Sequence, residues 1–130
     1  MSDLKTVQTP DAPAAIGPYA QAVVADGWVF CSGQIALDPA TMELTGGDAA
    51  AQTERVMQNL AAVLKAAGAS LSTVVKTTVF LSDMNHFVPM NEVYGRHLGD
   101  HRPARATVAV KGLPKGVDVD IYCVARVAAT

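Results

Sequence analysis

The sequence predicts one α+β domain, residues 1–130, in which a six-stranded mixed sheet carries two helices on one face. Six segments with strand patterns and two with helical spacing follow one another in the order β-β-β-α-β-α-β-β. Each helix lies between strands, and we expect each strand–helix–strand connection of this length to join two strands that pair in parallel, with a right-handed crossover. Two helices cover only one face of such a sheet, so its opposite face remains without a cover from this chain.

Composition agrees with a globular domain and narrows the partners. Half of the 130 residues are hydrophobic and 17% are charged, and the net charge is −2, so we expect neither nucleic acid nor anionic lipid as a partner. No apolar run reaches the ~18 residues of a membrane span, and the N-terminus lacks the apolar core of a signal peptide. Cys31 and Cys123 fall in strand patterns without a metal or redox motif, which indicates buried thiols in a cytoplasmic protein.

The first three strands lie near the N-terminus. Residues 4–8 have the pattern of a short edge strand, and a proline-rich loop follows them. Segments 21–26 and 28–33 form a hairpin around Asp26-Gly27, because Asp-Gly is among the strongest two-residue turn signals. Tyr19 stands just before this hairpin. An aromatic hydroxyl in such a place is more often a packed rim residue than a ligand contact.

Two helices with apolar stripes follow. The first begins after the N-cap Asp48 and stops at Gly68. The strand at 74–83 precedes the second helix, in which Asn91 lies beside the stripe. The stripe residues are Met57, Leu60, Val63, Leu64 and Ala67 in the first helix, and Phe87, Met90, Tyr94 and Leu98 in the second. Three histidines near the second helix lack the spacing of metal ligands, so we expect no metal and no cofactor.

The last two strand patterns are predicted to pair as a hairpin; they span residues 106–110 and 117–125. If both apolar rows face the core, Thr107 lies opposite Asp120. Arg105 then faces Tyr122 and lies diagonal to Asp120, within reach of a long side chain. A guanidinium, a hydroxyl and a carboxylate would therefore share the face that the core does not use. A cross-strand ion pair on a solvated face is the commoner meaning of this pattern, and a ligand site is the other.

Apolar residues on both faces of the sheet favour an oligomer. The strands at 28–33 and 74–83 carry apolar side chains on either side, and a large apolar face in water would be unusual for a monomer. We therefore expect a homo-oligomer that buries the second face. An arginine shielded in this way needs an anion, so Arg105 would pair either with Asp120 or with a ligand.

Several motifs make the chain similar to one known family. In order, these motifs are APAAIGPYAQAV, FCSGQIALDPATMEL, KTTVF, RPARATVAV and LPKGVDVDI. They resemble the RidA family, also called YjgF/YER057c/UK114, from about Thr9 to Val127. The resemblance implies a chorismate-mutase-like fold of the bacillus type and a homotrimer with three sites in the clefts between subunits. It also implies a cofactor-independent hydrolase that converts reactive enamines and imines, such as 2-aminoacrylate and 2-iminopropanoate, to 2-keto acids and ammonia.

The resemblance assigns substrate-binding roles to four positions. Arg105 matches the arginine that clamps the substrate carboxylate, a task that suits the planar guanidinium fork better than a lysine. Tyr19 and Ser32 match the tyrosine and serine that line the cleft. Asn91 matches the helix asparagine that reaches into it. A small-molecule carboxylate is therefore the ligand that the resemblance implies.

Two catalytic positions and one rim position depart from the family pattern. Thr107 stands where many members have cysteine, and it can still exchange hydrogen bonds with a water. Asp120 stands where they have glutamate, and its side chain is shorter by roughly 1.5 Å. This difference matters because misplacing a catalytic group by about 1 Å can lower the rate on the order of 10²-fold. In our hypothesis Arg105 anchors the carboxylate while Thr107 and Asp120, or the Asp120 backbone carbonyl, hold the attacking water. Arg102 replaces an aromatic residue before the proline and alters the rim of the cleft.

Three other functions stay open at this point. The two catalytic departures are compatible with a deaminase for a different imine-bearing acid in a dedicated pathway. The same cleft could serve a non-catalytic, holdase-like protein that captures small carboxylates. Ribonuclease activity is known among relatives, but the mildly acidic composition and the absence of a basic stripe argue against it.

Overall fold

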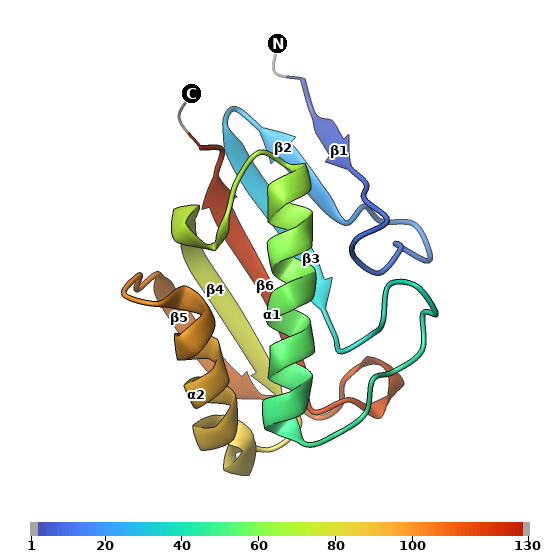
Figure 1. The fold of residues 1–130 in the computed structure, drawn as a ribbon, viewed down its shortest axis with the longest axis vertical. Coiled ribbons are helices and arrows are strands. Elements are labelled where there is room, and N and C mark those ends of the chain that lie inside the picture. Colours follow the sequence, from blue (N-terminus) through green and yellow to red (C-terminus); the bar gives the residue numbers. More distant parts are fainter. Residues whose placement is uncertain (1–2, 129–130) are drawn as a thin grey trace.

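The computed structural model describes residues 3–128, which form one six-stranded sheet with two helices packed on one face (Figure 1). The strands are β1 (Lys5–Val7), β2 (Ala22–Ala25), β3 (Trp28–Gln34), β4 (Val74–Leu81), β5 (Ala104–Ala109) and β6 (Val119–Arg126). The helices are α1 (Ala49–Ala66) and α2 (Phe87–Leu98), with short 3-10 turns η1 (Leu71–Thr73), η2 (Met84–His86) and η3 (Pro114–Gly116). The predicted fold class and element order are confirmed. None of the described helices is long and apolar enough to cross a lipid bilayer.

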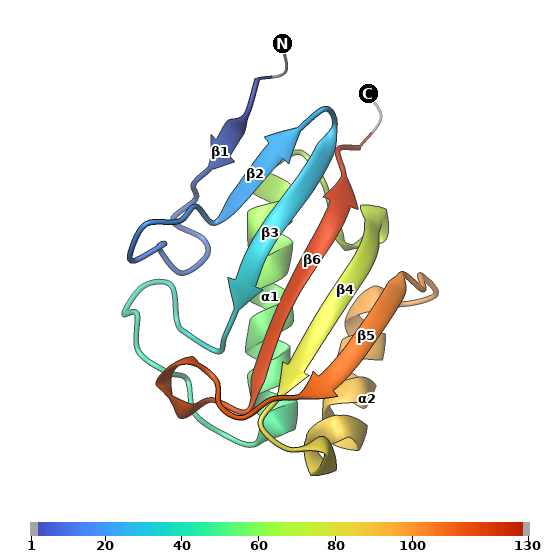
Figure 2. The same ribbon diagram turned by 180° about the vertical axis from the view of Figure 1, so that it is seen from behind.

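The position of β6 overturns one prediction from the sequence. The strand order is β1-β2-β3-β6-β4-β5, with β6 antiparallel to both β3 and β4 and β5 parallel to β4. The last two strands therefore do not form a hairpin, and the expected pairs of Thr107 with Asp120 and of Arg105 with Tyr122 were wrong. The segment between these strands instead passes beyond the end of β4 (Figure 2).

Burial of β4 and β6 explains this arrangement. On the side of the helices, Val79 faces Ile121 and Leu81 faces Val119, and all four side chains are fully buried. Side-by-side pairing places these apolar rows under the helices, where their burial stabilises the fold most. β5 is largely exposed in this chain and lies at the edge of the sheet. Alternation along a strand reveals its two faces but not its neighbour, which is why the sequence suggested the wrong partner.

The two helical crossovers differ in whether the strands that they join are neighbours in the sheet. The connection through α2 joins β4 to β5 as parallel neighbours, as predicted. The connection through α1 joins β3 to β4, which run in the same direction but are separated by β6. The expectation that both crossovers join paired strands was therefore wrong for the first of them.

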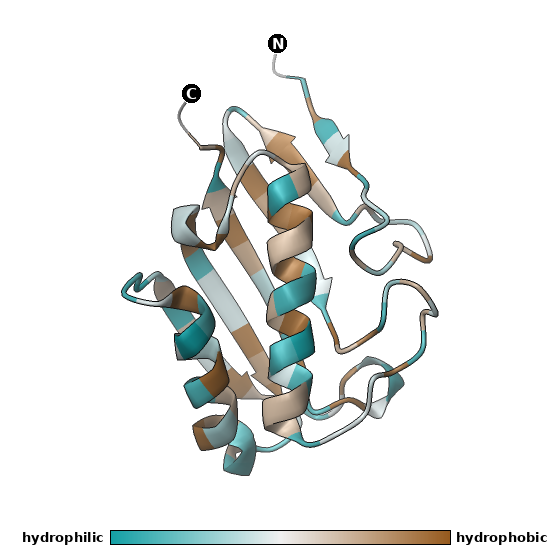
Figure 3. Ribbon diagram, in the orientation of Figure 1, coloured by the Kyte–Doolittle hydropathy of each residue, from teal (hydrophilic) through white to brown (hydrophobic). Residues whose placement is uncertain are grey.

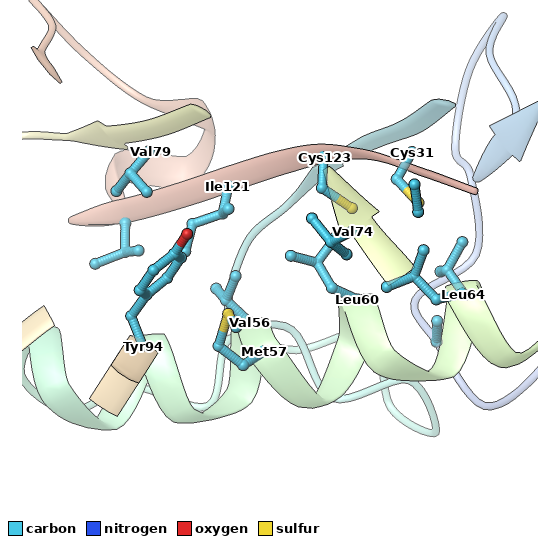
Figure 4. Packing of buried hydrophobic residues seen from close by; sticks show 14 of the residues in the cluster. Cys31, Val56, Met57, Leu60, Leu64, Val74, Val79, Tyr94, Ile121 and Cys123 are labelled. Atoms are coloured by element: carbon cyan, nitrogen blue, oxygen red, sulfur yellow. The ribbon is translucent and has the colours of Figure 1, made fainter. Parts of the chain in front are cut away.

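A core between α1 and the sheet holds the two layers together. Asp48 caps α1 by accepting a hydrogen bond from the Ala51 N–H (2.9 Å), and Gly68 leaves the helix with a positive φ of 82°, as its sequence position predicted. Hydrophobic residues run along the strands behind α1 (Figure 3). Figure 4 shows the packing of this core, in which α1 contributes Val56, Met57, Leu60 and Leu64.

The opposite face of the sheet has no helix over it (Figure 2). Its large side chains remain accessible: Phe30 is 49% exposed, Val108 43% and Tyr122 38%. Tyr122 also stacks on the half-buried Phe80, with 5.9 Å between the ring centroids. We call this surface, made by Phe30, Phe80, Val108 and Tyr122, the bare face. It is the apolar second face from which the sequence predicted an oligomer.

Candidate functional site

Arg105 lies on the helix side of the edge strand β5. The parallel register sets it level with the buried Thr77 of β4, so its side chain projects toward α2. Its Nη1 donates a hydrogen bond to Asn91 Oδ1 (2.6 Å), and its guanidinium lies over the rings of Phe87 and Tyr94, 5.4 and 5.0 Å from their centroids. Strand and helix together therefore hold the guanidinium in one orientation.

Tyr94 makes this support rigid. The side chain is buried, and its hydroxyl forms a 2.6 Å hydrogen bond with Thr77 Oγ1 on the neighbouring strand. Such a bonded aromatic ring gives a cation a fixed surface on which to stack. The sequence identified Tyr94 only as a stripe residue of the second helix, because its contact with Arg105 depends on the pairing of β4 with β5.

A pocket of about 440 Å³ opens beside Arg105. Its wall includes Asn91, Tyr94, Arg102 and Arg105, and no acidic residue among those the structure describes lines it. Arg105 is exposed in the single chain, and its expected cover by a partner subunit stays a prediction. The guanidinium keeps further N–H groups for a ligand, which makes this pocket a candidate binding site for an anion.

Thr107 follows Arg105 by two residues and shares its face of β5. Its Oγ1 is buried and has no hydrogen-bond partner among the described residues. A buried hydroxyl without a partner is costly and marks a place where a water or a ligand atom would be stabilised. Thr107 therefore shares the strand face of Arg105, but it is not among the residues that line the pocket beside Arg105.

Asp120 belongs to a second group, on the other face of the sheet. It pairs with Phe80 of the bare face, so it points away from the side on which Arg105 lies. Arg105 and Asp120 of one chain therefore do not converge, and that prediction was wrong. The reason is the orientation of β5. Its apolar row, which was expected to face the core, lies on the bare face, where Val108 is level with Phe80. Arg105 therefore faces the helices, whereas Asp120 of β6 faces away from them.

A β-bulge in β3 makes room for Asp120. Cys31 pairs with Cys123, and Gln34 pairs with Ile121. Between these two pairs β3 therefore contains one more residue than β6, which defines the bulge. Gly33 lies within the bulge, where a Cβ atom would meet Asp120 Oδ1 at 2.5 Å. Only glycine admits the carboxylate so close to the backbone. The sequence contained Gly33 in a motif, but it gave no sign of this contact.

Asp120 lines a second pocket of about 410 Å³, to which Tyr19 and Gly33 also contribute. The carboxylate oxygen Oδ1 is buried without a hydrogen-bond partner among the described residues. Burial disfavours the charged form and raises the pKa of Asp120 from 3.8 to about 6. A carboxyl group with this pKa can accept and return a proton near neutral pH.

Tyr19 and Ser32, the other two predicted residues, lie near this second pocket with different roles. Tyr19 is 55% exposed and forms part of the wall. The Ser32 hydroxyl instead donates to the Ala20 carbonyl oxygen (2.6 Å), which ties the loop before β2 to β3. Gln21, which sequence reasoning missed, anchors the same loop: it is buried and donates to the Pro13 carbonyl oxygen at 2.8 Å.

The raised pKa predicts how Asp120 affects stability as the pH changes. Below pH 3.8 the carboxyl is protonated in both folded and unfolded chains and carries no penalty. Between pH 3.8 and 6 the unfolded chain loses its proton first, so the free energy of unfolding falls as the pH rises. Asp120→Asn removes this titration. At a constant protein concentration, we expect the variant to gain on the order of 1–3 kcal/mol relative to wild type between pH 4 and pH 8, measured by urea denaturation. A difference that stays constant over this range would contradict the prediction.

Comparison with known proteins places the chain in a family. Residues 9–127 match the family described as Endoribonuclease L-PSP. Protein DfrA of Myxococcus xanthus is 54% identical over 123 residues, 93% of this chain and 94% of that protein. The human 2-iminobutanoate/2-iminopropanoate deaminase is 43% identical over 121 residues, 93% of this chain and 88% of that protein. The crystal structure of RidA from an Antarctic Psychrobacter covers 94% of this chain and 98% of its own, with a TM-score of 0.90 at 47% identity.

No group of three histidine, cysteine or acidic side chains that could hold a metal ion occurs within residues 3–128. The candidate site residues contribute arginine, carboxyl and hydroxyl groups. These lie on the motifs by which the sequence resembled RidA proteins, within the segment that the family match covers. The chain belongs to the RidA (YjgF/YER057c/UK114) family, to which the matching family description, Endoribonuclease L-PSP, also refers.

Proposed function

We propose that this protein is an imine deaminase that hydrolyses 2-imino acids and their enamine tautomers to 2-keto acids and ammonia. The observation that carries the proposal is the Arg105 guanidinium, which is held by Asn91 and two aromatic rings beside a pocket without acidic residues. Such a group is suited to bind the carboxylate common to all 2-imino acids. The human relative at 43% identity is named for this activity toward 2-iminobutanoate and 2-iminopropanoate.

The active unit in this proposal is a homotrimer with its sites between subunits. Arg105 and Asp120 of one chain lie on opposite faces of the sheet, so one chain cannot bring them to the same substrate. A cleft between two copies would join the Arg105 pocket of one subunit to the Asp120 pocket of the next. The bare face supports an oligomer independently, because its exposed aromatic and aliphatic side chains would be buried by a second copy.

The proposed chemistry needs binding, a positioned water and one proton relay. Arg105 binds the substrate carboxylate and presents the imine carbon, while the unpartnered Thr107 hydroxyl holds the water. Asp120 accepts a proton as the water adds to the carbon of the protonated imine, and returns it to the nitrogen of the resulting carbinolamine. Ammonia then leaves as the carbonyl forms, and the hydroxyl proton passes to the departing ammonia or to solvent. One water enters, the carbon–nitrogen bond breaks and no cofactor takes part. The pKa of about 6 suits Asp120 for both transfers. We place this activity in the cytoplasm.

A coupled assay tests the proposal. An amino-acid oxidase generates 2-imino acids from several amino acids, and ammonia release is followed with and without the protein. We expect the protein to accelerate release, and saturating pyruvate to inhibit it by occupying the carboxylate site. Ammonia release that the protein does not change for any imine would exclude the deaminase. Tight binding of keto acids without turnover would then favour the holdase-like, carboxylate-binding alternative.

A further inference from the structure

Arg102 brings a second guanidinium to the pocket beside Arg105. Both arginines belong to its wall, although only Arg105 is required to bind the carboxylate of a 2-imino acid. The ion pairs among the described residues involve His86 and His97, and neither arginine takes part in them. No carboxylate lines the pocket either. Two cationic groups therefore face one pocket to which residues 3–128 supply no counter-ion.

The end of α2 holds Arg102 in place. Gly99 adopts a positive φ of 62° after the last helical residue, so the chain turns back across the helix end. The Arg102 Nη1 then donates to the carbonyl oxygens of Gly99 (2.6 Å) and His101 (2.9 Å). The partial negative charge at a helix C-terminus also favours a cation there. This guanidinium is therefore positioned before any ligand arrives.

These two bonds leave one side of the guanidinium unused. Both hydrogens of Nη1 can be taken by the two carbonyls, while Nε and Nη2 have no partner within the described part of the chain. The Nε–Nη2 edge is a planar fork that matches a carboxylate with two parallel hydrogen bonds. Arg105 likewise uses one nitrogen, Nη1, for Asn91 and keeps the rest.

We propose that this pocket selects 2-imino dicarboxylates, with Arg105 on the carboxylate next to the imine carbon and Arg102 on the second, distal carboxylate. This inference rests on the proposed deaminase function and specifies its substrate class. A monocarboxylate would neutralise one of the two guanidinium groups and leave the other without an anion. A dicarboxylate of four or five carbons neutralises both, and a pocket of about 440 Å³ has room for it. Arg102 is thus a specificity-determining residue.

Binding of matched keto acids tests the inference without relying on turnover. 2-Oxoglutarate and 2-oxopentanoate have the same number of carbons and differ in the distal carboxylate. By calorimetry, we expect wild type to bind 2-oxoglutarate at least about 10-fold more tightly, and Arg102→Gln to lose this preference. Arg96→Gln is the matched control, because it removes one positive charge from an exposed position of α2 outside the pocket wall. Equal binding of the two acids by wild type, or a preference that survives Arg102→Gln, would overturn the inference.

The rate of imine hydrolysis provides a second arm of the test, besides keto-acid binding. Imines made from glutamate and from 2-aminopentanoate are compared, and we expect Arg102→Gln to lower the ratio of their kcat/KM values by about 10- to 100-fold. A ratio unchanged by Arg102→Gln would contradict the inference. The two arms separate the two proposals. If no imine is hydrolysed but the Arg102-dependent preference for 2-oxoglutarate is present, the dicarboxylate site stands and the deaminase function falls.

Discussion

Replacing Arg105 with alanine is expected to lower kcat/KM for 2-iminopropanoate hydrolysis by on the order of 10²–10³-fold. The variant loses the charge-assisted hydrogen bonds that orient the substrate carboxylate. Arg102, the other guanidinium of the pocket, cannot replace them, because the Gly99 and His101 carbonyl oxygens hold it at the end of α2. Because Arg105 is exposed in the chain, we expect the free energy of unfolding to change by only about 0.5 kcal/mol. Ammonia release and urea denaturation measure the two effects separately.

Arg105→Lys is the matched control for charge. Lysine keeps the positive charge but cannot form two parallel hydrogen bonds with a carboxylate. We expect it to recover part of the lost activity, so that its kcat/KM lies between those of wild type and Arg105→Ala. Alanine and wild-type proteins with equal kcat/KM would remove the arginine clamp from the mechanism, whatever the lysine variant does.

Placing a carboxylate on the bare face is expected to dissociate the oligomer and abolish the activity with it. Val108 is 43% exposed and sits beside Phe80 in the register of β5 with β4. If another copy covers this face, Val108→Asp buries an unpaired charge, at a cost of about 3–5 kcal/mol for each interface. We expect wild type to be a trimer by light scattering at micromolar concentration and Val108→Asp to be a monomer without deaminase activity.

Val88→Asp controls for the added charge. Val88 is 64% exposed on α2, on the helix side of the sheet, and is not part of the bare face. We expect this variant to remain a trimer with activity close to that of wild type. A Val108→Asp protein that remains trimeric, or a wild-type protein that is monomeric and fully active, would be incompatible with a site shared between subunits.

Local sequence patterns predicted the elements of this fold but not all of their neighbours. The Asp26-Gly27 turn, the Asp48 cap and the apolar stripes depend on residues close in the chain, and the strands and helices they predicted are present. The pairing of β6 with β3 and β4 depends on which apolar rows are best buried together. That is a property of the whole sheet, and alternation within one strand does not contain it.

For the candidate site, too, the residues could be predicted from the sequence but their arrangement in space could not. The resemblance to the RidA family identified Arg105, Asn91 and Asp120 as site residues, and the structure does place Asn91 on the Arg105 guanidinium. The separation of Arg105 and Asp120 onto two faces was not predicted, because the apolar row of β5 was expected to face the core and lies on the bare face instead. The close approach of Gly33 to Asp120 was also not predicted, since it requires a bulge that inserts one extra residue into β3.

The placement of Arg105 and Asp120 on opposite faces of one sheet has a consequence for genetics. If each cleft takes its arginine from one polypeptide and its acid from another, two alleles that are each inactive can rescue one another. A cell that makes both Arg105→Ala and Asp120→Asn chains would assemble mixed trimers, and each mixed trimer would contain one cleft with both groups intact. Intragenic complementation of this kind would not arise if each polypeptide worked alone.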